Sequence, residues 1–506
     1  MIPVNSVAVG IFGVFVAATL AITYWASRRS ATAENFYAAG GVITAPQNAM
    51  AMAGDYLSAA AFLGTVAVFS GVGVSGLLYT VGSVAGWPIA LFLVGEKLRN
   101  LGRYSFSDAL AHRLADRPVR TLAAVSALCI TFSYLVAQMV GGGTLVEILF
   151  NIPYRYAVAL VGLLMMAYVV FGGMLAATWI QVIKATLLLL ATVAMVLLLL
   201  PHFGWSVDTL FGAAVHARKD PAGYLRTGQL VADPISAVSL GLAFALGPAG
   251  LPHVLMRFFT VKDGPTARRS LVLATFIIAA FQILVVIVGY AAAALLPNGP
   301  MSGGANMAAV HLAQRLGGEA LMGVIAAVSF ATILAVASGL LIAGASAVSH
   351  DLFKHTLMGG RVTESAEIRV SRIATLSLGS GVILLAMLCE HQNIGFLATL
   401  PLAVAASVNF PVLILAMHWR GLTTRGAVAG GYAGLLLSVL LIIVSKAVWV
   451  DILGHRDGLF PYQYPTLFSL SAALLVALIG SVTDRSVRGI KDRVAFRAQI
   501  AQSEGG

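Results

Sequence analysis

The sequence predicts an all-α integral membrane protein with about 13 transmembrane helices. Of its 506 residues, 59% are hydrophobic and 10% are charged, and the mean hydropathy is +0.92. A soluble globular protein carries about a quarter charged residues. Apolar stretches such as 185–200 are continuous rather than alternating, which favours helices over the strands of a membrane barrel. At roughly 20 residues per crossing, the spans leave no room for a large catalytic domain, so we do not expect an enzyme.

Thirteen apolar runs are the expected spans. They cover 7–26, 45–73, 76–96, 119–147, 155–175, 179–201, 234–258, 270–297, 318–349, 370–389, 394–418, 427–449 and 465–483. We therefore expect one transmembrane domain over 1–483, followed by a polar tail over 484–506. The basic residues of that tail could form a short amphipathic helix on the inner leaflet, or simply a positively charged anchor.

The basic residues are distributed unevenly between the predicted loops. With the N-terminus outside, 23 of the 31 Lys and Arg residues fall on the inner side and 7 on the outer side, while Lys184 lies within a span. Arg257 is among the 23, at the inner end of the seventh span. This asymmetry predicts a multi-pass protein of the inner (plasma) membrane, with its C-terminus in the cytoplasm. It also accounts for the net charge of +11 without a nucleic-acid partner.

The two cysteines of this chain are not expected to form a disulfide or to bind a metal. Cys129 and Cys389 both lie in apolar runs, so the sequence predicts neither a disulfide framework nor a cysteine metal site. No paired acids or HExxH-type cluster is visible within the spans. We therefore expect no cofactor.

Two of the predicted spans contain residues that interrupt a helix. The second contains Gly54, Asp55 and Ser58 near its middle, and the seventh contains the segment 247–252, with the letters GPAGLP. Irregular backbone at membrane depth persists only where it is buried or lines a cavity, and broken helices at matching positions in two halves are typical of transporters with inverted repeats. Spans 2–6 and 7–11 would form those halves, because an odd offset of five reverses their orientation.

The motifs in and around these spans resemble the sodium/solute symporter family over essentially the whole chain, and within it most closely the cation–acetate symporters. They read ENFYAAGG before the second span, AGDYLSAAAFLG within it, FGGMLAATW at the end of the fifth, GLPHVLMRFFTV in the seventh, FATILAVASGLLIAGASAVSHDL in the ninth and LTTRGAVAGG before the twelfth. The resemblance implies a LeuT-type 5+5 inverted repeat with alternating access. Its halves would be 45–201 and 234–418, with 7–26 as an extra N-terminal span and 427–483 as two C-terminal spans.

The function implied by the resemblance is cation-coupled uptake of acetate or a similar short-chain monocarboxylate. Symport suits an anionic substrate, since moving one negative charge into a cell that is 100 mV negative inside costs about 2.3 kcal/mol. Another small organic solute of the same family is the alternative, and a channel-like or sensor protein is a more distant one. The expected partners are the lipid bilayer and this small solute; the oligomeric state is open, and so is the choice between Na⁺ and H⁺.

Asp55 is the only acid near the middle of a predicted span. A carboxylate there is expensive, so a role as cation ligand or proton carrier is the default hypothesis. The alternative is a helix cap that accepts from the backbone of Leu57 or Ser58. By resemblance, Gly54 and Leu57 match the family positions whose carbonyls bind sodium.

The ninth span would complete that cation site. By resemblance, Thr332 matches a carbonyl ligand, while Ala335 and Val336 match a pair of hydroxyl residues and have no hydroxyl. Thr332 and Ser338 could substitute, or could bond to their own helix. Gln181 stands where many family members carry an Asp.

Further polar residues are candidates for binding the substrate. His253 could relay protons or be a satisfied interface residue, and we expect Lys184 to snorkel to the inner surface. For Tyr134 and Gln138, substrate orientation and ordinary hydrogen bonding between helices are equally open. The residues expected to bind substrate are Ser58, Tyr134, Gln138, Gly247, Gly250 and Asn409.

Overall fold

The computed structural model describes most of the chain. The described residues are 9–11, 13–14, 17–18, 21, 42–58, 60–102, 104–296, 301–390, 392, 394–450 and 453–503, without the side chains of 171–177 and 447. Most of the predicted first span 7–26 and the basic pair Arg28–Arg29 therefore lie outside the described residues.

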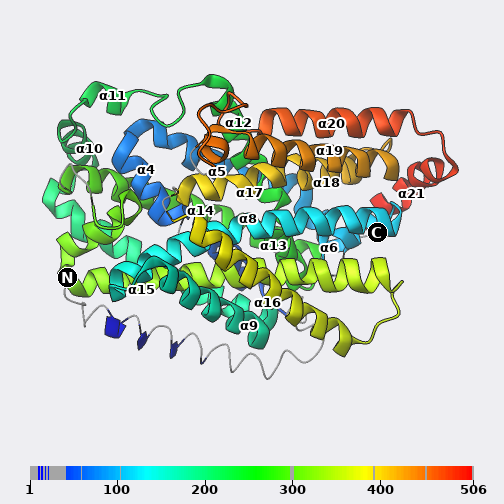
Figure 1. Ribbon diagram of the computed structural model, residues 1–506, viewed down its shortest axis with the longest axis horizontal. Coiled ribbons are helices and arrows are strands. Elements are labelled where there is room, and N and C mark those ends of the chain that lie inside the picture. The colour runs from blue at the N-terminus through cyan, green and yellow to red at the C-terminus, as the bar shows by residue number, and fades with distance from the viewer. Residues whose placement is uncertain are drawn as a thin grey trace.

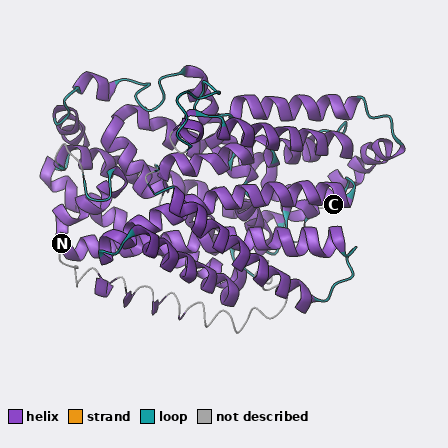
Figure 2. Cartoon of the chain, viewed as in Figure 1, coloured by secondary structure: helices purple, strands orange, loops and turns teal. Residues whose placement is uncertain are grey.

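The protein is all-helical, with 84% helix and no strand among the described residues (Figure 2). Eight described segments are long and apolar enough to cross a membrane, and Tyr154–Val170 and Pro234–Leu246 are shorter apolar helices. The multi-span prediction is therefore confirmed, whereas the count of thirteen is not.

The first half of the chain forms a broken helix followed by long helices. The broken helix consists of α3 (Ala45–Tyr56), a π-helical turn (Ala60–Gly64) and α4 (Thr65–Val72). After it come α5 (Leu77–Ala90), α6 (Glu96–Leu101), α7 (Phe106–Ala111), α8 (Asp116–Phe150), α9 (Tyr154–Leu199), and two short helices, α10 (Val207–His216) and α11 (Pro221–Leu225).

The second half also begins with a broken helix. It consists of α12 (Pro234–Leu246), a 3₁₀ turn (Pro248–Gly250) and α13 (Pro252–Met256). It is followed by α14 (Gly264–Leu295), α15 (Ala308–Ser346) with a π-helical extension (Ala347–Leu357), α16 (Glu364–Leu388), α17 (Ile394–Ser407), α18 (Asn409–His418), α19 (Thr424–Ile443), α20 (Thr466–Val482) and α21 (Val487–Ser503). Both breaks lie where the sequence predicts them.

Local sequence explains where several of these helices begin. Asp233 and Asp263 precede a proline or a Gly-Pro pair, and their carboxylates accept hydrogen bonds from the backbone of Ser236 at 2.6 Å and Thr266 at 2.9 Å. Such acceptors satisfy backbone donors that the first turn of a helix leaves free, and proline fits that turn because it lacks the N–H. The starts of α12 and α14 are therefore set by short-range chemistry.

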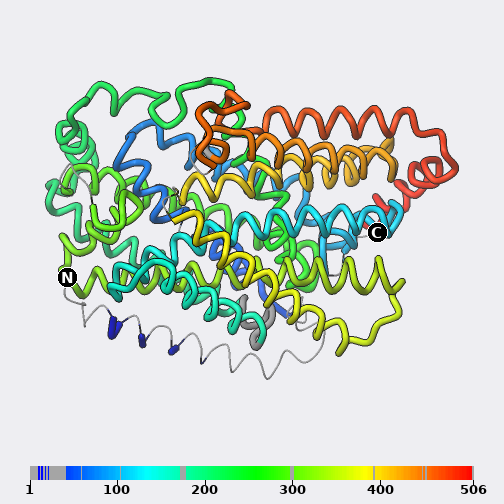
Figure 3. The backbone as a smooth tube through the Cα atoms, viewed as in Figure 1, coloured from blue at the N-terminus to red at the C-terminus, as the bar shows by residue number. Residues whose placement is uncertain are grey.

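The long helices run roughly parallel to the longest axis of the molecule (Figure 1). α8 and α15 lie inside the bundle, and both contact α9 and α16. α17 contacts the turns at both breaks, so it holds the two irregular segments against each other. α10 and α11 lie at one end of the bundle and α21 at the other, as the tube in Figure 3 also shows.

The C-terminal tail forms a helix that docks on the bundle. α21 turns away from α20 by 104°, and it contacts α6 and α19. Asp492 is fully buried and accepts from both the backbone N and the hydroxyl of Thr424 at 2.7 Å. The tail therefore contains a helix, one of the two alternatives considered for it, and part of this helix faces protein.

Candidate functional site

A buried ion pair joins the two broken helices. Asp55, in the last turn of α3, accepts hydrogen bonds from Arg257 Nε at 2.6 Å and Arg257 Nη2 at 3.1 Å. Arg257 follows α13 directly, and its Nη1 donates to the hydroxyl of Thr178 at 2.8 Å. Both charged residues are 1% exposed. The sequence-based assignment of Arg257 to the inner surface is therefore wrong, because the carboxylate of Asp55 holds it in the core.

Two polar residues of α9 reach across to the backbone of α15. Gln181 Nε2 donates to Asp55 Oδ1 at 2.5 Å and to the carbonyl of Ala335 at 3.0 Å. Lys184 Nζ donates to the carbonyl of Thr332 at 3.1 Å, and Lys184 is 1% exposed. The expected snorkelling of Lys184 is thus wrong: its ammonium group binds a helix carbonyl inside the protein.

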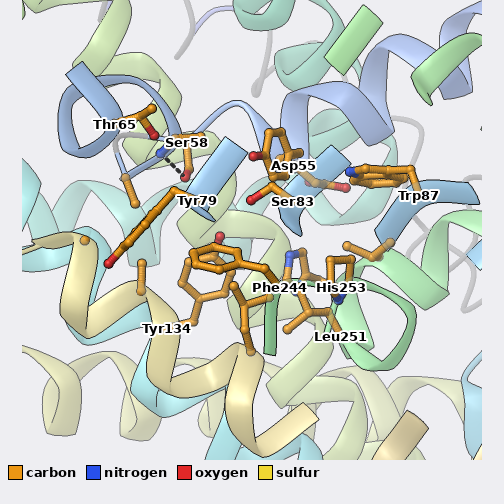
Figure 4. A pocket seen from close by; sticks show the side chains of 18 residues that line it. Asp55, Ser58, Thr65, Tyr79, Ser83, Trp87, Tyr134, Phe244, Leu251 and His253 are labelled. Atoms are coloured by element: carbon orange, nitrogen blue, oxygen red, sulfur yellow. Dashed lines mark hydrogen bonds between the residues drawn. The ribbon is translucent and has the colours of Figure 1, made fainter. Parts of the chain in front are cut away.

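A cavity of about 50 Å³ lies between the two breaks. Figure 4 shows residues from α3, α5, α8 and the second broken helix arranged around it. Its walls include the hydroxyl residues Ser58, Thr65, Tyr79, Ser83 and Tyr134. Phe244, Leu251, Ala398 and Leu402 supply apolar surface. The cavity therefore combines polar groups with an apolar wall.

Two buried residues in this wall have nitrogen atoms without a hydrogen-bond partner in the described part of the chain. They are Trp87, through Nε1, and His253, through both ring nitrogens. They are 1% and 2% exposed. His253 packs edge-on to Tyr134, with ring centroids 5.6 Å apart. Because buried polar groups are nearly always hydrogen-bonded, these two residues are the strongest candidates to bind a polar solute, and Trp87 was not among the predicted residues.

The cavity is lined by only part of the predicted substrate set. Ser58 and Tyr134 line it, whereas Gln138, Gly247, Gly250 and Asn409 are not among its lining residues. Gln138 is fully buried, and its amide atoms have no hydrogen-bond partner among the described residues.

Asn409 and the predicted glycines hold helices together. Asn409 donates to the carbonyl of Gly250 at 2.8 Å and accepts from Ser126 at 2.6 Å. A Cβ atom at Gly247 would lie 2.8 Å from the carbonyl oxygen of Leu402. Asn409 and Gly247, which were predicted to bind substrate, therefore have a role in the packing of helices.

Around Asp55, the predicted cation residues lie at the point where α3 ends and packs on α9. A Cβ at Gly54 would lie 2.8 Å from the backbone oxygen of Gln181, so α3 packs tightly on α9 there. The helix-cap alternative for Asp55 is wrong, because the backbone N–H groups of Leu57 and Ser58 donate to the carbonyls of Ala53 and Tyr56. Leu57 is fully buried at the first break.

On α15, the predicted cation residues contribute no free hydroxyl. Thr332 and Ser338 donate to the carbonyls of Val328 and Leu334 within their own helix, at 2.8 Å and 2.7 Å. Ala335 and Val336 are buried and have no oxygen in their side chains. Ala335 offers a carbonyl, but that carbonyl already accepts from Gln181.

A second charged cluster contains metal-ligand residue types. Atoms of Asp108, His350 and Asp351 lie within 4.8 Å of one another. Arg120 Nη1 fills this cluster, at 2.7 Å from Asp108 and 3.1 Å from Asp351. Burial alone would raise the pKa of Asp108, but its hydrogen bond to His350 and the positive charges around it outweigh burial and lower that pKa well below its usual range. The guanidinium group of Arg120 therefore supplies the positive charge that a metal ion would supply to these carboxylates.

Comparisons with known proteins agree with this architecture. Residues 36–434 match the model of the sodium:solute symporter family. A Na⁺-coupled sialic acid symporter in a substrate-bound outward-open state is similar in structure, with a TM-score of 0.74 and 17% identity over 94% of this chain and 97% of that one.

Two further solved structures show a weaker likeness. A nucleobase-cation-symport-1 family transporter in a closed conformation has a TM-score of 0.55 and 14% identity, covering 91% of this chain and 98% of that one. A mutant of the manganese transporter of Eremococcus coleocola has a TM-score of 0.52 and 15% identity, covering 92% and 96%. At these identities the likeness shows the fold, which is that of LeuT-type transporters.

Broken helices that meet at a buried cavity within such a bundle define a secondary transporter rather than an enzyme. The chain belongs to the sodium:solute symporter family, because the family model matches most of its length.

A sodium ion is the coupling ion that the family name implies. Na⁺ is a hard cation and needs oxygen ligands, as Ca²⁺ and Mg²⁺ do. At the predicted position, α9 contributes the ammonium group of Lys184 and the amide group of Gln181, and their nitrogens already bind carbonyls of α15. The Oε1 atom of Gln181 has no partner among the described residues, but a single amide oxygen does not make a sodium shell next to an ammonium group. The residues present therefore do not fit a sodium ion at this position.

Proposed function

We propose that this symporter takes up acetate or a similar short-chain monocarboxylate together with a cation, Na⁺ or H⁺. The observation that carries the proposal is the cavity at the two breaks, with its two unpaired nitrogen-bearing side chains. Its volume of about 50 Å³ exceeds the roughly 10–15 Å³ that a single water molecule needs. A small solute such as acetate agrees with a cavity of this size better than a large one does.

Charge supports an anionic solute. The three buried charged groups around the breaks are Asp55, Arg257 and Lys184, with one negative and two positive formal charges. One monovalent anion would make the set neutral, and a buried charge is tolerated best when it is paired. In our proposal the carboxylate accepts from Trp87 and His253, and the alkyl group faces Phe244 and Leu402.

Orientation and boundaries form part of the same proposal. The N-terminus would lie outside and α21 in the cytoplasm of a cell whose inner membrane holds the protein, with repeats over 45–201 and 234–418. Symport then draws one anion inward with at least one cation. The cation offsets the cost of about 2.3 kcal/mol per 100 mV that the anion alone would meet.

Uptake of labelled acetate into proteoliposomes tests the proposal. A sodium gradient and a proton gradient are imposed in separate assays, and propionate, pyruvate and proline are added as competitors. We expect saturable acetate uptake that propionate inhibits strongly, since one methylene changes recognition by only about 1–3 kcal/mol. Counterflow into liposomes preloaded with acetate should also occur, as expected of a carrier and not of a channel.

The family alternative, another small organic solute, makes a different prediction in the same assay. If proline inhibits or is itself transported while acetate is not, the monocarboxylate proposal is wrong. The assignment to the symporter family would remain.

A further inference from the structure

We propose that the ammonium group of Lys184 is a built-in cation that takes the place of sodium at the contact between α9 and α15, so that no sodium ion binds there. The proposal refines the coupling ion of the proposed function. It rests on side chains whose positions and partners are described above.

The first argument is the partner of Lys184. Its Nζ lies 3.1 Å from the carbonyl oxygen of Thr332, the carbonyl position that the resemblance assigns to a cation. An ammonium group carries the same single positive charge as Na⁺ and has three donors and no acceptor. It satisfies the carbonyl oxygen and contributes no ligand to a second cation.

The second argument is the set of missing oxygen atoms. Ala335 and Val336 stand where hydroxyl groups would complete a sodium shell, and their side chains offer none. The hydroxyls of Thr332 and Ser338 are both bonded to their own helix. A sodium ion would therefore find no free side-chain oxygen among these residues of α15 to replace its water ligands.

The third argument concerns the neighbouring carboxylate. Both oxygens of Asp55 accept hydrogen bonds from Arg257, and Oδ1 also accepts from Gln181. Asp55 is thus neutralised by a fixed guanidinium group. A sodium ion here would meet two positive side chains within the protein, where repulsion between charges is stronger than in water.

The test measures sodium binding directly on the purified, full-length protein. ²²Na⁺ binding is compared between the wild type, the variant Ala335→Ser/Val336→Ser, and the variant Lys184→Ala/Ala335→Ser/Val336→Ser. We expect no specific binding to the first two and one sodium ion per protein in the third. The double variant is the matched control, because it supplies the hydroxyl groups and keeps the ammonium group.

Two results would overturn the proposal. One is equal sodium binding by the double and triple variants, which would show that Lys184 does not exclude the ion. The other is a correctly folded triple variant, eluting as a single species, that binds no sodium.

A measurement on the wild type alone covers the case in which the triple variant does not fold. A ligand that binds only the native state raises the unfolding temperature. We expect the same unfolding temperature in about 100 mM NaCl as in choline chloride at equal concentration. A sodium-specific rise would contradict the proposal.

The outcome is separable from that of the proposed function. If acetate is not transported but sodium binds only after Lys184 is replaced, the substrate proposal fails and the built-in cation stands. If acetate is transported and the wild type binds sodium, the substrate proposal stands and the proposal of a built-in cation fails.

Discussion

At the residue scale, the carboxylate of Asp55 is bound by protein donors from two other helical segments. Arg257 and Gln181 reach it from beyond α13 and from α9. Removing one partner of a buried ion pair leaves an uncompensated charge in the interior, which costs about 3–5 kcal/mol. Asp55 therefore has a structural role, because it links the two broken helices.

We predict that Asp55→Asn lowers the free energy of unfolding by about 3–5 kcal/mol. It should also abolish concentrative uptake. The amide keeps the shape but leaves Arg257 charged and only partly bonded. Thermal unfolding of the detergent-solubilised protein and acetate uptake are the measurements.

The double variant Asp55→Asn/Arg257→Gln is the control for this charge argument. It removes both charges and should regain most of the lost stability. An Asp55→Asn protein as stable as the wild type would contradict the ion-pair account.

Trp87 gives a prediction in which stability and affinity diverge. Its indole N–H has no partner among the described residues, so Trp87→Phe removes a donor that the substrate-free protein does not satisfy. Phe fills less of this buried position, so we expect a modest loss of stability. We expect acetate binding to weaken about 10-fold or more, because a hydrogen bond to a charged group contributes about 1.5–3 kcal/mol. Trp449→Phe is the control, since Trp449 stacks on His455 and is not among the cavity residues. Equal acetate affinities in the two variants would remove Trp87 from the site.

At the scale of elements, the second break depends on close approach of backbones. A Cβ at Gly250 would lie 2.6 Å from the carbonyl oxygen of Ala405 and 3.1 Å from the backbone nitrogen of Phe410. α17 and α18 thus pack directly on the irregular segment. A side chain at this position has to push them away from it.

We predict that Gly250→Val inserts into the membrane but transports no acetate. Forcing extra carbon atoms into a packed site costs typically about 1–3 kcal/mol, while insertion depends on apolar length. Uptake and membrane yield are measured together. Gly212→Val is the control, because a Cβ at Gly212 meets nothing within 4 Å; normal uptake by Gly250→Val would place the site elsewhere.

The docked helix α21 is a second element with a defined anchor. Asp492 accepts two hydrogen bonds at the start of α19 and pairs with Arg488 at 2.9 Å. Asp492→Ala should lower the free energy of unfolding by about 1–3 kcal/mol, the cost of leaving a buried donor unsatisfied. Unfolding temperature measures the effect. Lys491→Ala, at an exposed neighbouring position, should leave it unchanged, and equal effects would rule out this anchor.

At the scale of the whole molecule, the ends of the bundle are separated along its longest axis. The α10–α11 connection and the helix α21 lie at opposite ends (Figure 1). We predict that Lys219→Cys and Arg361→Cys, introduced after Cys129 and Cys389 are replaced by Ala, react with an impermeant thiol reagent from opposite sides of the membrane. Labelling of both from one side would contradict the proposed inverted repeat.

The membrane class and the positions of both broken helices could be predicted from the amino-acid sequence alone. These features are local, since continuous apolar length sets the spans and Gly and Pro interrupt the helix at their own positions. Resemblance added the family and pointed to the carbonyl of Thr332. It also indicated that Ala335 and Val336 lack the expected hydroxyl groups.

The pairing of the buried charges and the lining of the cavity depend on contacts between helices that are distant in the chain. Arg257 is 202 residues from Asp55 along the chain, and Lys184 is 148 from Thr332. Apolar periodicity contains no information on such distant pairs. The sequence therefore placed Arg257 at the inner end of its span and predicted that Lys184 snorkels to the inner surface. Trp87 was not among the residues predicted from the sequence, and the packing of α5 leaves its N–H beside the cavity without a partner among the described residues. Burial is the physical reason for all three, because a charge or donor removed from water must find its partner within the fold or in a ligand.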